Sequence, residues 1–147
     1  MSNYLAPKFF HQFCLIIRIF LFFIIIFFSF SYNVYSSELD NLFIKLKQSD
    51  NAVLARNYES KIWKIWLNSG SSDASNNQMQ IGLKLMENGQ LVHAQKVFEE
   101  ISIKDPNWAE SYNKIATVKF LKGDYSGSIN DIQKTLKLEP RHFGAIS

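Results

Sequence analysis

The feature that most constrains this fold is a 34-residue repeat within residues 75–141. Gly89 recurs as Gly123, and Pro106 recurs as Pro140, each 34 residues later. Between these anchors the segment NGQLVHAQKVFEEISIKDP aligns with KGDYSGSINDIQKTLKLEP. A period of this length, with a glycine near mid-unit and a proline at its end, is typical of arrays of helix–turn–helix repeats. The sequence therefore predicts an all-α chain of stacked helical hairpins.

Small residues occupy the positions where the two helices of each unit must approach closely. Gly82 and Ala94 stand on the first and second helix of one unit, and Ala116 and Ser128 take the same positions in the next. Small side chains there allow antiparallel helices to pack about 8–10 Å apart. Apolar residues around them, such as Phe98, follow a 3.6-residue rhythm. Because one hairpin cannot bury its own apolar face, neighbouring units are expected to stack.

Glycine and proline mark the helix ends of each unit. Gly89 and Gly123 are expected to end the first helices, because glycine adopts the left-handed conformation of a helix stop at little cost. Pro106 and Pro140 cannot continue a helix interior, so each is expected to close a second helix. These four positions predict the boundaries of two repeats, at residues 76–107 and 109–141.

The two units resemble the tetratricopeptide repeat family, whose pattern is W-x2-L-G-x2-Y, then A-x3-F, then P. The first unit fits this pattern as Gln78-x2-Ile81-Gly82-x2-Leu85, then Ala94-x3-Phe98, then Pro106. In the second unit the same positions hold Tyr112, Ile115-Ala116, Lys119, Ser128-x3-Ile132 and Pro140. Gln78 and Lys119 depart from the pattern at its Trp and Tyr positions. The resemblance implies an α-solenoid, a right-handed stack of helical hairpins, that binds proteins.

Residues 39–147 also resemble one group of exported alphaproteobacterial tetratricopeptide repeat proteins. The matching blocks are LDNLFIKL, IWKIWLNSGS, WAESYNKIATVKFLKGDYSGSINDI and LEPRHFGAIS, in that order. This resemblance implies a periplasmic location and binding through the repeats. It implies no particular activity, since the group has none assigned.

The first 36 residues are predicted to be an export signal or a signal anchor. Lys8 and Arg18 precede and border an uncharged apolar run at residues 19–30, and Val34-Tyr35-Ser36 is a candidate cleavage site. Twelve apolar residues suit a signal peptide, whereas a membrane-spanning helix needs about 20. Residues 9–30 would serve as an anchor helix if the leader is not cleaved. Under either hypothesis the basic amino end stays inside and the repeats reach the periplasmic side.

The regions flanking the repeats are less regular. Residues 37–67 predict a degenerate helical hairpin, followed by a polar linker at residues 68–75. Residues 142–147 resemble the start of a further helix. Three hypotheses account for this uncovered end: truncation of a longer protein, self-association, or docking of a partner.

Composition excludes several classes of function. Residues 37–147 carry fourteen Lys and Arg, the sixteen of the chain less Lys8 and Arg18, against thirteen Asp and Glu. This balance leaves no basic patch for nucleic acid. The only cysteine, Cys14, lies in the leader. Disulfides and cysteine zinc sites are therefore excluded from residues 37–147, and no cofactor is expected.

No catalytic or metal-binding constellation is apparent. His93 and His142 lack a second ligand at helical spacing, so neither predicts a metal site; His93 is expected on an exposed face, and His142 to cap a helix or touch a partner. Adjacent Glu99 and Glu100 point about 100° apart on a helix and cannot pair as catalytic carboxylates. Trp63 and its neighbours at helical spacing are expected to pack as core. An enzyme is not expected.

The candidate partner site is the groove formed by the first helix of each unit. Ile81, Gly82 and Leu85 are expected to face the packing seam. The groove residues would then be Met79, Leu83, Met86, Glu110, Asn113, Thr117 and Phe120. Such a surface suits an amphipathic helix or an extended peptide. The alternative is that a following helix covers these apolar groups.

The sequence thus supports two hypotheses of function. The first is an exported interaction scaffold that binds a peptide or helix of an unidentified protein in its groove. The alternative is a membrane-anchored structural or assembly subunit that associates through its uncapped carboxyl-terminal repeat.

Overall fold

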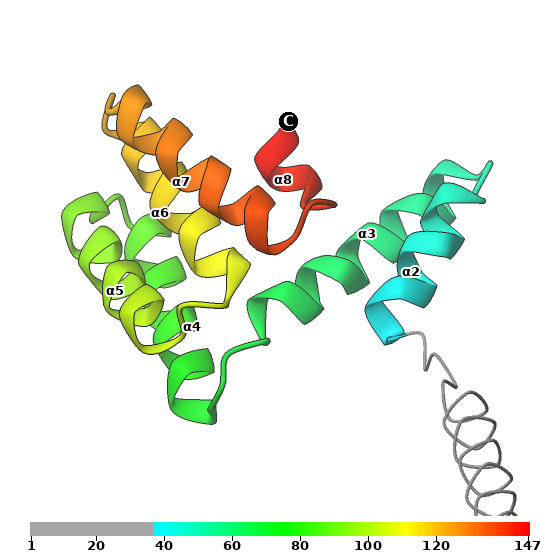
Figure 1. The fold of residues 1–147 in the computed structure, drawn as a ribbon, viewed down its shortest axis with the longest axis horizontal. Helices are drawn as coiled ribbons and strands as arrows, with labels where there is room; N and C mark the ends of the chain where they lie inside the picture. The colour runs from blue at the N-terminus through cyan, green and yellow to red at the C-terminus, as the bar shows by residue number, and fades with distance from the viewer. Residues whose placement is uncertain (1–36) are drawn as a thin grey trace, which may run out of the picture. The chain divides into compact units, whose positions relative to one another are not determined.

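The structure is a computed structural model that describes residues 37–147. The predicted signal or anchor at residues 1–36 lies outside the described residues. All regular secondary structure in residues 37–147 is helical, which confirms the all-α prediction. The helices, shown in Figure 1, are α2 (Glu38–Lys47), α3 (Ala52–Leu67), α4 (Asp73–Glu87), α5 (Leu91–Lys104), α6 (Ala109–Leu121), α7 (Tyr125–Leu138) and α8 (Phe143–Ile146).

The two glycines end their helices as the repeat predicts. Gly89 and Gly123 have φ of 71° and 83°, in the left-handed region. The Gly89 N–H donates to Met86 O at 3.0 Å, and the next N–H, of Gln90, donates to Leu85 O at 2.8 Å. The same two bonds recur 34 residues later, at Gly123 and Asp124. This pair of bonds is the Schellman motif, which satisfies the last carbonyl groups of α4 and α6.

Helix α4 begins earlier than predicted. It starts at Asp73, and its N-cap is Ser72, whose hydroxyl accepts a hydrogen bond from the Ser75 N–H at 3.2 Å. Asp73 in the first turn is favourable at the positive end of the helix dipole. The linker between α3 and α4 is therefore residues 68–72 and not 68–75 as expected. The cap of this helix therefore lies inside the polar run, at Ser72.

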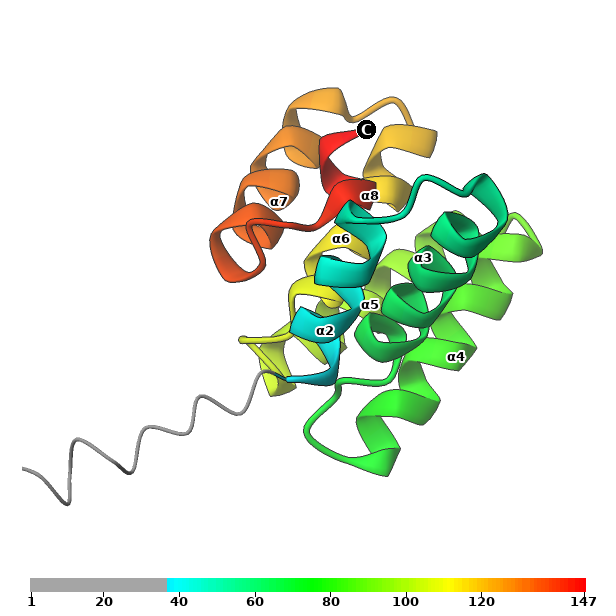
Figure 2. The same ribbon diagram turned by 90° about the vertical axis from the view of Figure 1, so that its right-hand side faces the viewer.

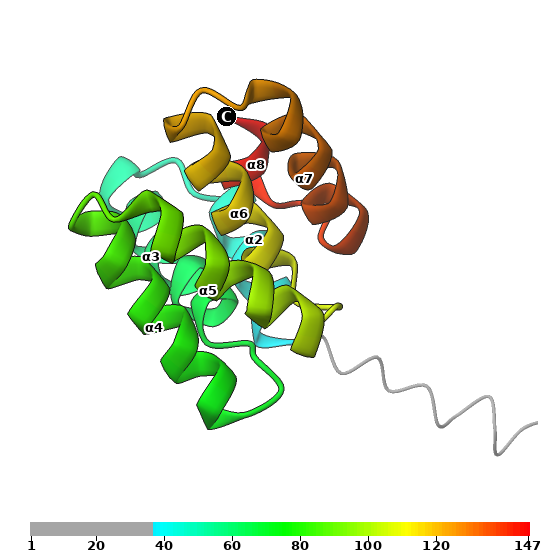
Figure 3. The same cartoon turned by 90° about the vertical axis from the view of Figure 1, so that its left-hand side faces the viewer.

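The repeats form a row of helices in which each packs on the next in sequence. Helix α5 packs against both α4 and α6, and α6 packs against α7 (Figures 1 and 3). Within the second unit, the Ser128 hydroxyl donates to Ala116 O at 2.9 Å. A side chain of α7 thus reaches the backbone of α6, which only small residues at both positions permit.

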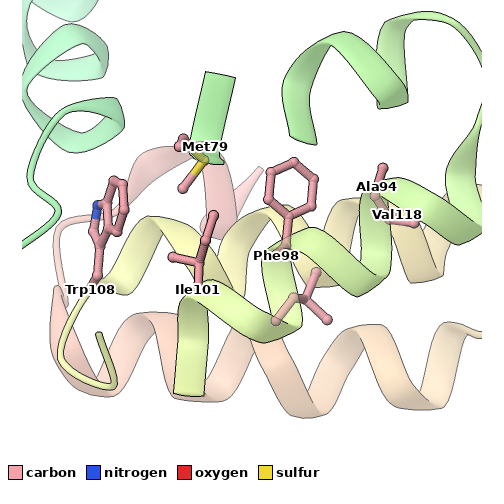
Figure 4. Close-up of a cluster of buried hydrophobic side chains, with 7 residues drawn as sticks. Met79, Ala94, Phe98, Ile101, Trp108 and Val118 are labelled. Carbon is pink, nitrogen blue, oxygen red and sulfur yellow. The ribbon is translucent and has the colours of Figure 1, made fainter. Parts of the chain in front are cut away.

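The main core joins both repeats. Its buried residues come from α4, α5, α6 and the turn before α6 (Figure 4): Met79, Ala94, Phe98, Ile101, Trp108, Ile115 and Val118. Gly82 lies against the ring of Phe98, and a Cβ at Gly82 would collide with that ring. The missing side chain therefore lets α4 and α5 approach closely.

The rotation of α4 about its axis differs from the prediction. Met79 was expected in the groove but is 0% exposed in the core, whereas Ile81 was expected in the seam and is 52% exposed. The reason is the contact between Gly82 and Phe98, which turns that side of α4 inward. Met79 lies about one turn earlier on the same side of the helix, so it is buried as well.

Helices α2 and α3 form a hairpin around a small buried cluster of Leu42, Ile62 and Trp66, against which Phe143 of α8 also packs. Asn51 caps α3, because its side chain accepts hydrogen bonds from the N–H groups of Val53 and Leu54. The hairpin packs on the repeats through α6, and Figure 2 shows α2 and α3 on the near side, with α6 behind them. Among residues 37–147, no helix is long and apolar enough to cross a membrane.

Candidate interaction surface

The predicted groove residues lie on equivalent positions of α4 and α6. A step of 34 residues relates Met79 to Asn113, Leu83 to Thr117 and Met86 to Phe120. We call these six residues together with Glu110 the inner face. On α6, positions 110, 113 and 117 lie on one side of the helix, because a helix turns 100° per residue.

The inner face divides into a covered and an open half. The covered half consists of Met79, Glu110 and Asn113, whose exposed fractions are 0%, 1% and 4%. The open half consists of Leu83, Met86, Thr117 and Phe120, of which the first three are half-buried and the last is exposed. The groove prediction therefore does not hold for the covered half as an accessible surface.

Glu110 anchors a buried polar cluster in the covered half. Its Oε2 lies 2.7 Å from Nε2 of His142 and accepts a hydrogen bond from the Asn113 amide at 3.2 Å. Its Oε1 lies 2.9 Å from Nζ of Lys114. Both Glu110 and His142 have side chains that are 0% exposed. A buried carboxylate requires such partners, since leaving it unpaired is costly.

The hairpin covers this cluster with two tryptophans of α3. The ring of His142 stacks on Trp66, with centroids 4.0 Å apart and planes at 10°. Trp108 donates its indole N–H to Trp66 O at 2.7 Å. Lys114 Nζ lies 5.1 Å from the ring centroid of Trp63, within cation–π range. Residues far apart in the sequence thus meet on one side of α6.

Arg141 joins the carboxyl-terminal segment to α2. Its guanidinium contacts Asp40 Oδ1 at 2.7 Å and the Glu139 carboxylate at 2.9 Å, and it lies 4.3 Å from the ring centroid of Phe43. Hydrogen bonds with Glu139 raise the pKa of Arg141, and the same bonds lower the pKa of Glu139. The side chains of Arg141 and Asp40 are each 43% exposed to solvent, so this ion pair is accessible.

The open half continues into an exposed aromatic patch at the turn between α6 and α7. Phe120, Leu121 and Tyr125 are 59%, 55% and 60% exposed. The rings of Phe120 and Tyr125 contact each other edge to face, with centroids 5.3 Å apart. Half-buried Leu83 and Met86, which also pack on the main core, belong to the same half.

The positions of two residues beside the covered half, His142 and Trp108, were not predicted. His142 was expected to cap a helix or touch a partner; it does precede α8 as its N-cap residue, but its side chain makes no capping bond and is buried against α3. Trp108 was not considered, although an indole next to a helix start needs both an apolar site and an acceptor. His93 is exposed, as expected. The described part of the chain contains no cluster of His, Cys, Asp or Glu suited to a metal ion.

The repeat-defining residues occupy structural positions. Ala94, Phe98, Ala116 and Ser128 are at most 3% exposed, and Gly82 lies against Phe98. Pro106 and Pro140 each follow the end of a second helix by two residues. These residues determine the spacing of the helices, and none of them belongs to the inner face.

No family model and no solved structure matches the chain. A TPR repeat-containing protein of Rhizobium etli is 38% identical to it over 110 residues, which make up 75% of this chain. The chain is a tetratricopeptide repeat protein. It spans about half the length of this curated relative, since the aligned part is 53% of that protein. Tetratricopeptide repeat proteins use their stacked helices as binding surfaces.

Proposed function

We propose that this tetratricopeptide repeat protein is an exported scaffold that binds a peptide or helix of a partner protein on the open half of its inner face. The observation that carries the proposal is the exposed aromatic pair of Phe120 and Tyr125. Phe120 shares the open half with half-buried Leu83 and Met86. An amphipathic helix fits best, because the adjoining half already contacts a helix of the chain itself, α3.

Export is supported by the sequence of the leader. Basic Lys8 and Arg18, the uncharged run at residues 19–30 and the small residues after it are typical of a signal peptide. The repeats would then act on the periplasmic side. Amino-terminal sequencing of the mature protein tests this part: a start near Ser37 supports cleavage and export, and protection of the repeats inside sealed spheroplasts would contradict it.

The partner surface can be tested by site-specific photo-crosslinking in living cells. A photoreactive amino acid in place of Phe120 should yield one dominant adduct, whereas the same group in place of Ile103, which is 79% exposed on α5, should not. The adduct partner, once purified, should bind the chain directly.

The second test introduces charged side chains on the open half. Phe120→Glu combined with Leu83→Glu should reduce the affinity for the purified partner at least tenfold, with the far-ultraviolet helical signal retained. Ile103→Glu is the matched control and should leave the affinity unchanged. Equal affinity of the wild type, the double variant and Ile103→Glu for the partner would refute the open half as the binding site.

A second candidate function, a membrane-anchored assembly subunit, is supported by α7. Ile129 and Leu138 are 54% and 38% exposed there, while Ile132 and Leu136 on the same helix are half-buried. If α7 mediates assembly, Ile129→Glu should dissociate oligomers in analytical ultracentrifugation, and the leader should remain intact. A monomer at all concentrations would exclude this candidate.

A further inference from the structure

The side of α6 that α3 covers has the features of a binding surface for a helix. Five residues form this surface, which we call the α3 slot: Trp108, Glu110, Lys114, His142 and Phe143. Each contacts Trp63 or Trp66 of α3 or supports a residue that does. Trp63 packs edge to face on Phe143 at 5.4 Å and lies beneath Lys114, and Trp66 stacks on His142.

The recognition elements on α3 are two aromatic residues three positions apart. Residues at i and i+3 project from one side of a helix, so Trp63 and Trp66 reach the slot together. The backbone also takes part, because Trp66 O accepts the indole N–H of Trp108. This is the arrangement by which amphipathic helices enter grooves of partner proteins, with anchors on one face.

The contact between α3 and the slot buries two polar atoms that make no hydrogen bond within the described part of the chain. Nδ1 of His142 and Nε1 of Trp66 are both buried, and neither has a hydrogen-bond partner in residues 37–147. Buried polar atoms without partners reduce the stability of the contact that buries them. The slot also buries the charged Glu110, where an apolar side chain would usually stabilise a permanent core better.

The outer edge of the same contact is exposed to water. Arg141 and Asp40, which join the carboxyl-terminal segment to α2, are each 43% exposed. Exposed ion pairs of this kind contribute little to stability. The hairpin therefore joins the rest of the chain through an imperfectly paired inner contact and a solvent-accessible outer contact, which are properties of an element that can separate as a unit.

We propose that the α3 slot is a second helix-binding surface, occupied in this structure by α3 itself and opened to an amphipathic partner helix with aromatic residues at i and i+3. The hairpin and the partner helix then compete for Trp108, His142 and Phe143. The proposal rests on the proposed scaffold function in one respect, that a partner protein of the scaffold supplies the helix. The slot itself lies outside the open half of the inner face.

Opening of the hairpin can be measured in the full chain by hydrogen exchange. The amides of α2 and α3 should exchange through an opening that leaves α4–α7 protected. Arg141→Gln should speed this opening about fivefold, since it removes an exposed ion pair and a cation–π contact. Arg56→Gln, on the exposed side of α3, is the matched control and should change nothing.

Tryptophan fluorescence gives an independent readout. All three tryptophans of the chain, Trp63, Trp66 and Trp108, lie at this contact. In urea, Arg141→Gln should shift their emission to longer wavelength at a lower denaturant concentration than in the wild type, before the far-ultraviolet helical signal is lost. Exchange of all helices through one common opening, unaffected by Arg141→Gln, would overturn the proposal.

A peptide of residues 52–67, labelled at its amino end, serves as the probe helix. It should bind the full chain saturably, about fivefold tighter to Arg141→Gln than to the wild type, in line with the weakened hairpin. The same peptide with Trp63→Ala and Trp66→Ala should not bind. An opened hairpin without saturable peptide binding would also overturn the proposal, because an accessible slot would then fail to take a helix.

The same probe separates this proposal from the proposed function. Phe120→Glu with Leu83→Glu alters only the open half, so peptide binding should persist in that variant. Loss of the crosslinked partner with retained peptide binding identifies two surfaces. If the variant loses peptide binding while it remains folded, the slot is not a separate site and the proposal is overturned.

Discussion

Gly82 determines how the first hairpin closes, because the ring of Phe98 occupies the space of a Cβ at that position. Gly82→Ala should therefore destabilise the chain despite the better helix propensity of alanine. We expect a loss of about 1–3 kcal/mol in the free energy of unfolding, typical of overpacking. Urea denaturation measures it.

Phe98→Leu provides the matched test of this contact. It should be destabilising alone, yet the double variant should lose less than the sum of the two single changes, since leucine leaves room for the new methyl group. Strict additivity would show that the two side chains do not compete for the same space.

Asp105 gives the folded chain a specific acid sensitivity. Hydrogen bonds from Ser71 and Ser75 lower the pKa of Asp105 below its ordinary value of 3.8. The folded state therefore binds this proton less readily than the unfolded state does. The resulting stabilisation is complete above the unfolded pKa and is lost as the pH falls through the folded pKa.

Asp105→Asn should make the decline of stability between about pH 5 and pH 2 shallower, because it removes this titration. Ser71→Ala with Ser75→Ala should have the same effect while it keeps the carboxylate. Denaturation curves across that pH range measure both. An unchanged slope in Asp105→Asn would show that other carboxylates dominate.

The helix stops of α4 and α6 depend on backbone conformation alone. Nothing lies within 4 Å of a Cβ built on Gly89 or Gly123, yet both have positive φ. Alanine at either position should cost about 1 kcal/mol of stability, from the strain of the left-handed conformation. Asparagine tolerates that conformation better and should cost less. Thermal denaturation of the four variants tests this order, and equal losses would contradict it.

The sequence predicted elements better than it predicted their rotation. Gly89, Gly123, Pro106 and Pro140 identified the helix ends because each acts through local backbone geometry. Met79 and Ile81 were assigned to the wrong sides of α4. Their burial depends on which face of α4 meets Phe98, a contact across the hairpin that no local pattern specifies.

The hairpin of α2 and α3 was predicted as an element, but its position was not. Its contacts run from Trp66 to Trp108 and His142, which no short-range pattern connects. The covered half of the inner face was missed for the same reason: Glu110 and Asn113 look like exposed polar residues until α3 and His142 are placed over them. The repeat alone placed Leu83, Met86, Thr117 and Phe120 on one face; in the structure the first three are half-buried and Phe120 is exposed.

The buried cluster at Glu110 joins three parts of the molecule: α6, the segment before α8 that contains His142, and α3, whose Trp66 stacks on His142. Glu110→Leu should cost about 2 kcal/mol, because it leaves the buried His142 ring nitrogen without its partner. Adding His142→Leu should recover part of this loss, since the unpaired polar ring is then gone. Urea denaturation followed by tryptophan emission and by circular dichroism measures both. A double variant that loses more than the sum would contradict this account.

The contact of Trp66 with His142 also dictates an order of assembly. The ribosome makes α3 before either repeat, but the ring that stacks on Trp66 is synthesised only after α7 is complete. Pairings between such distant residues form late in folding, because a long loop must close first. The tryptophans of α3 are thus made early and shielded late, and during that interval their exposed apolar surface favours aggregation of the incomplete chain.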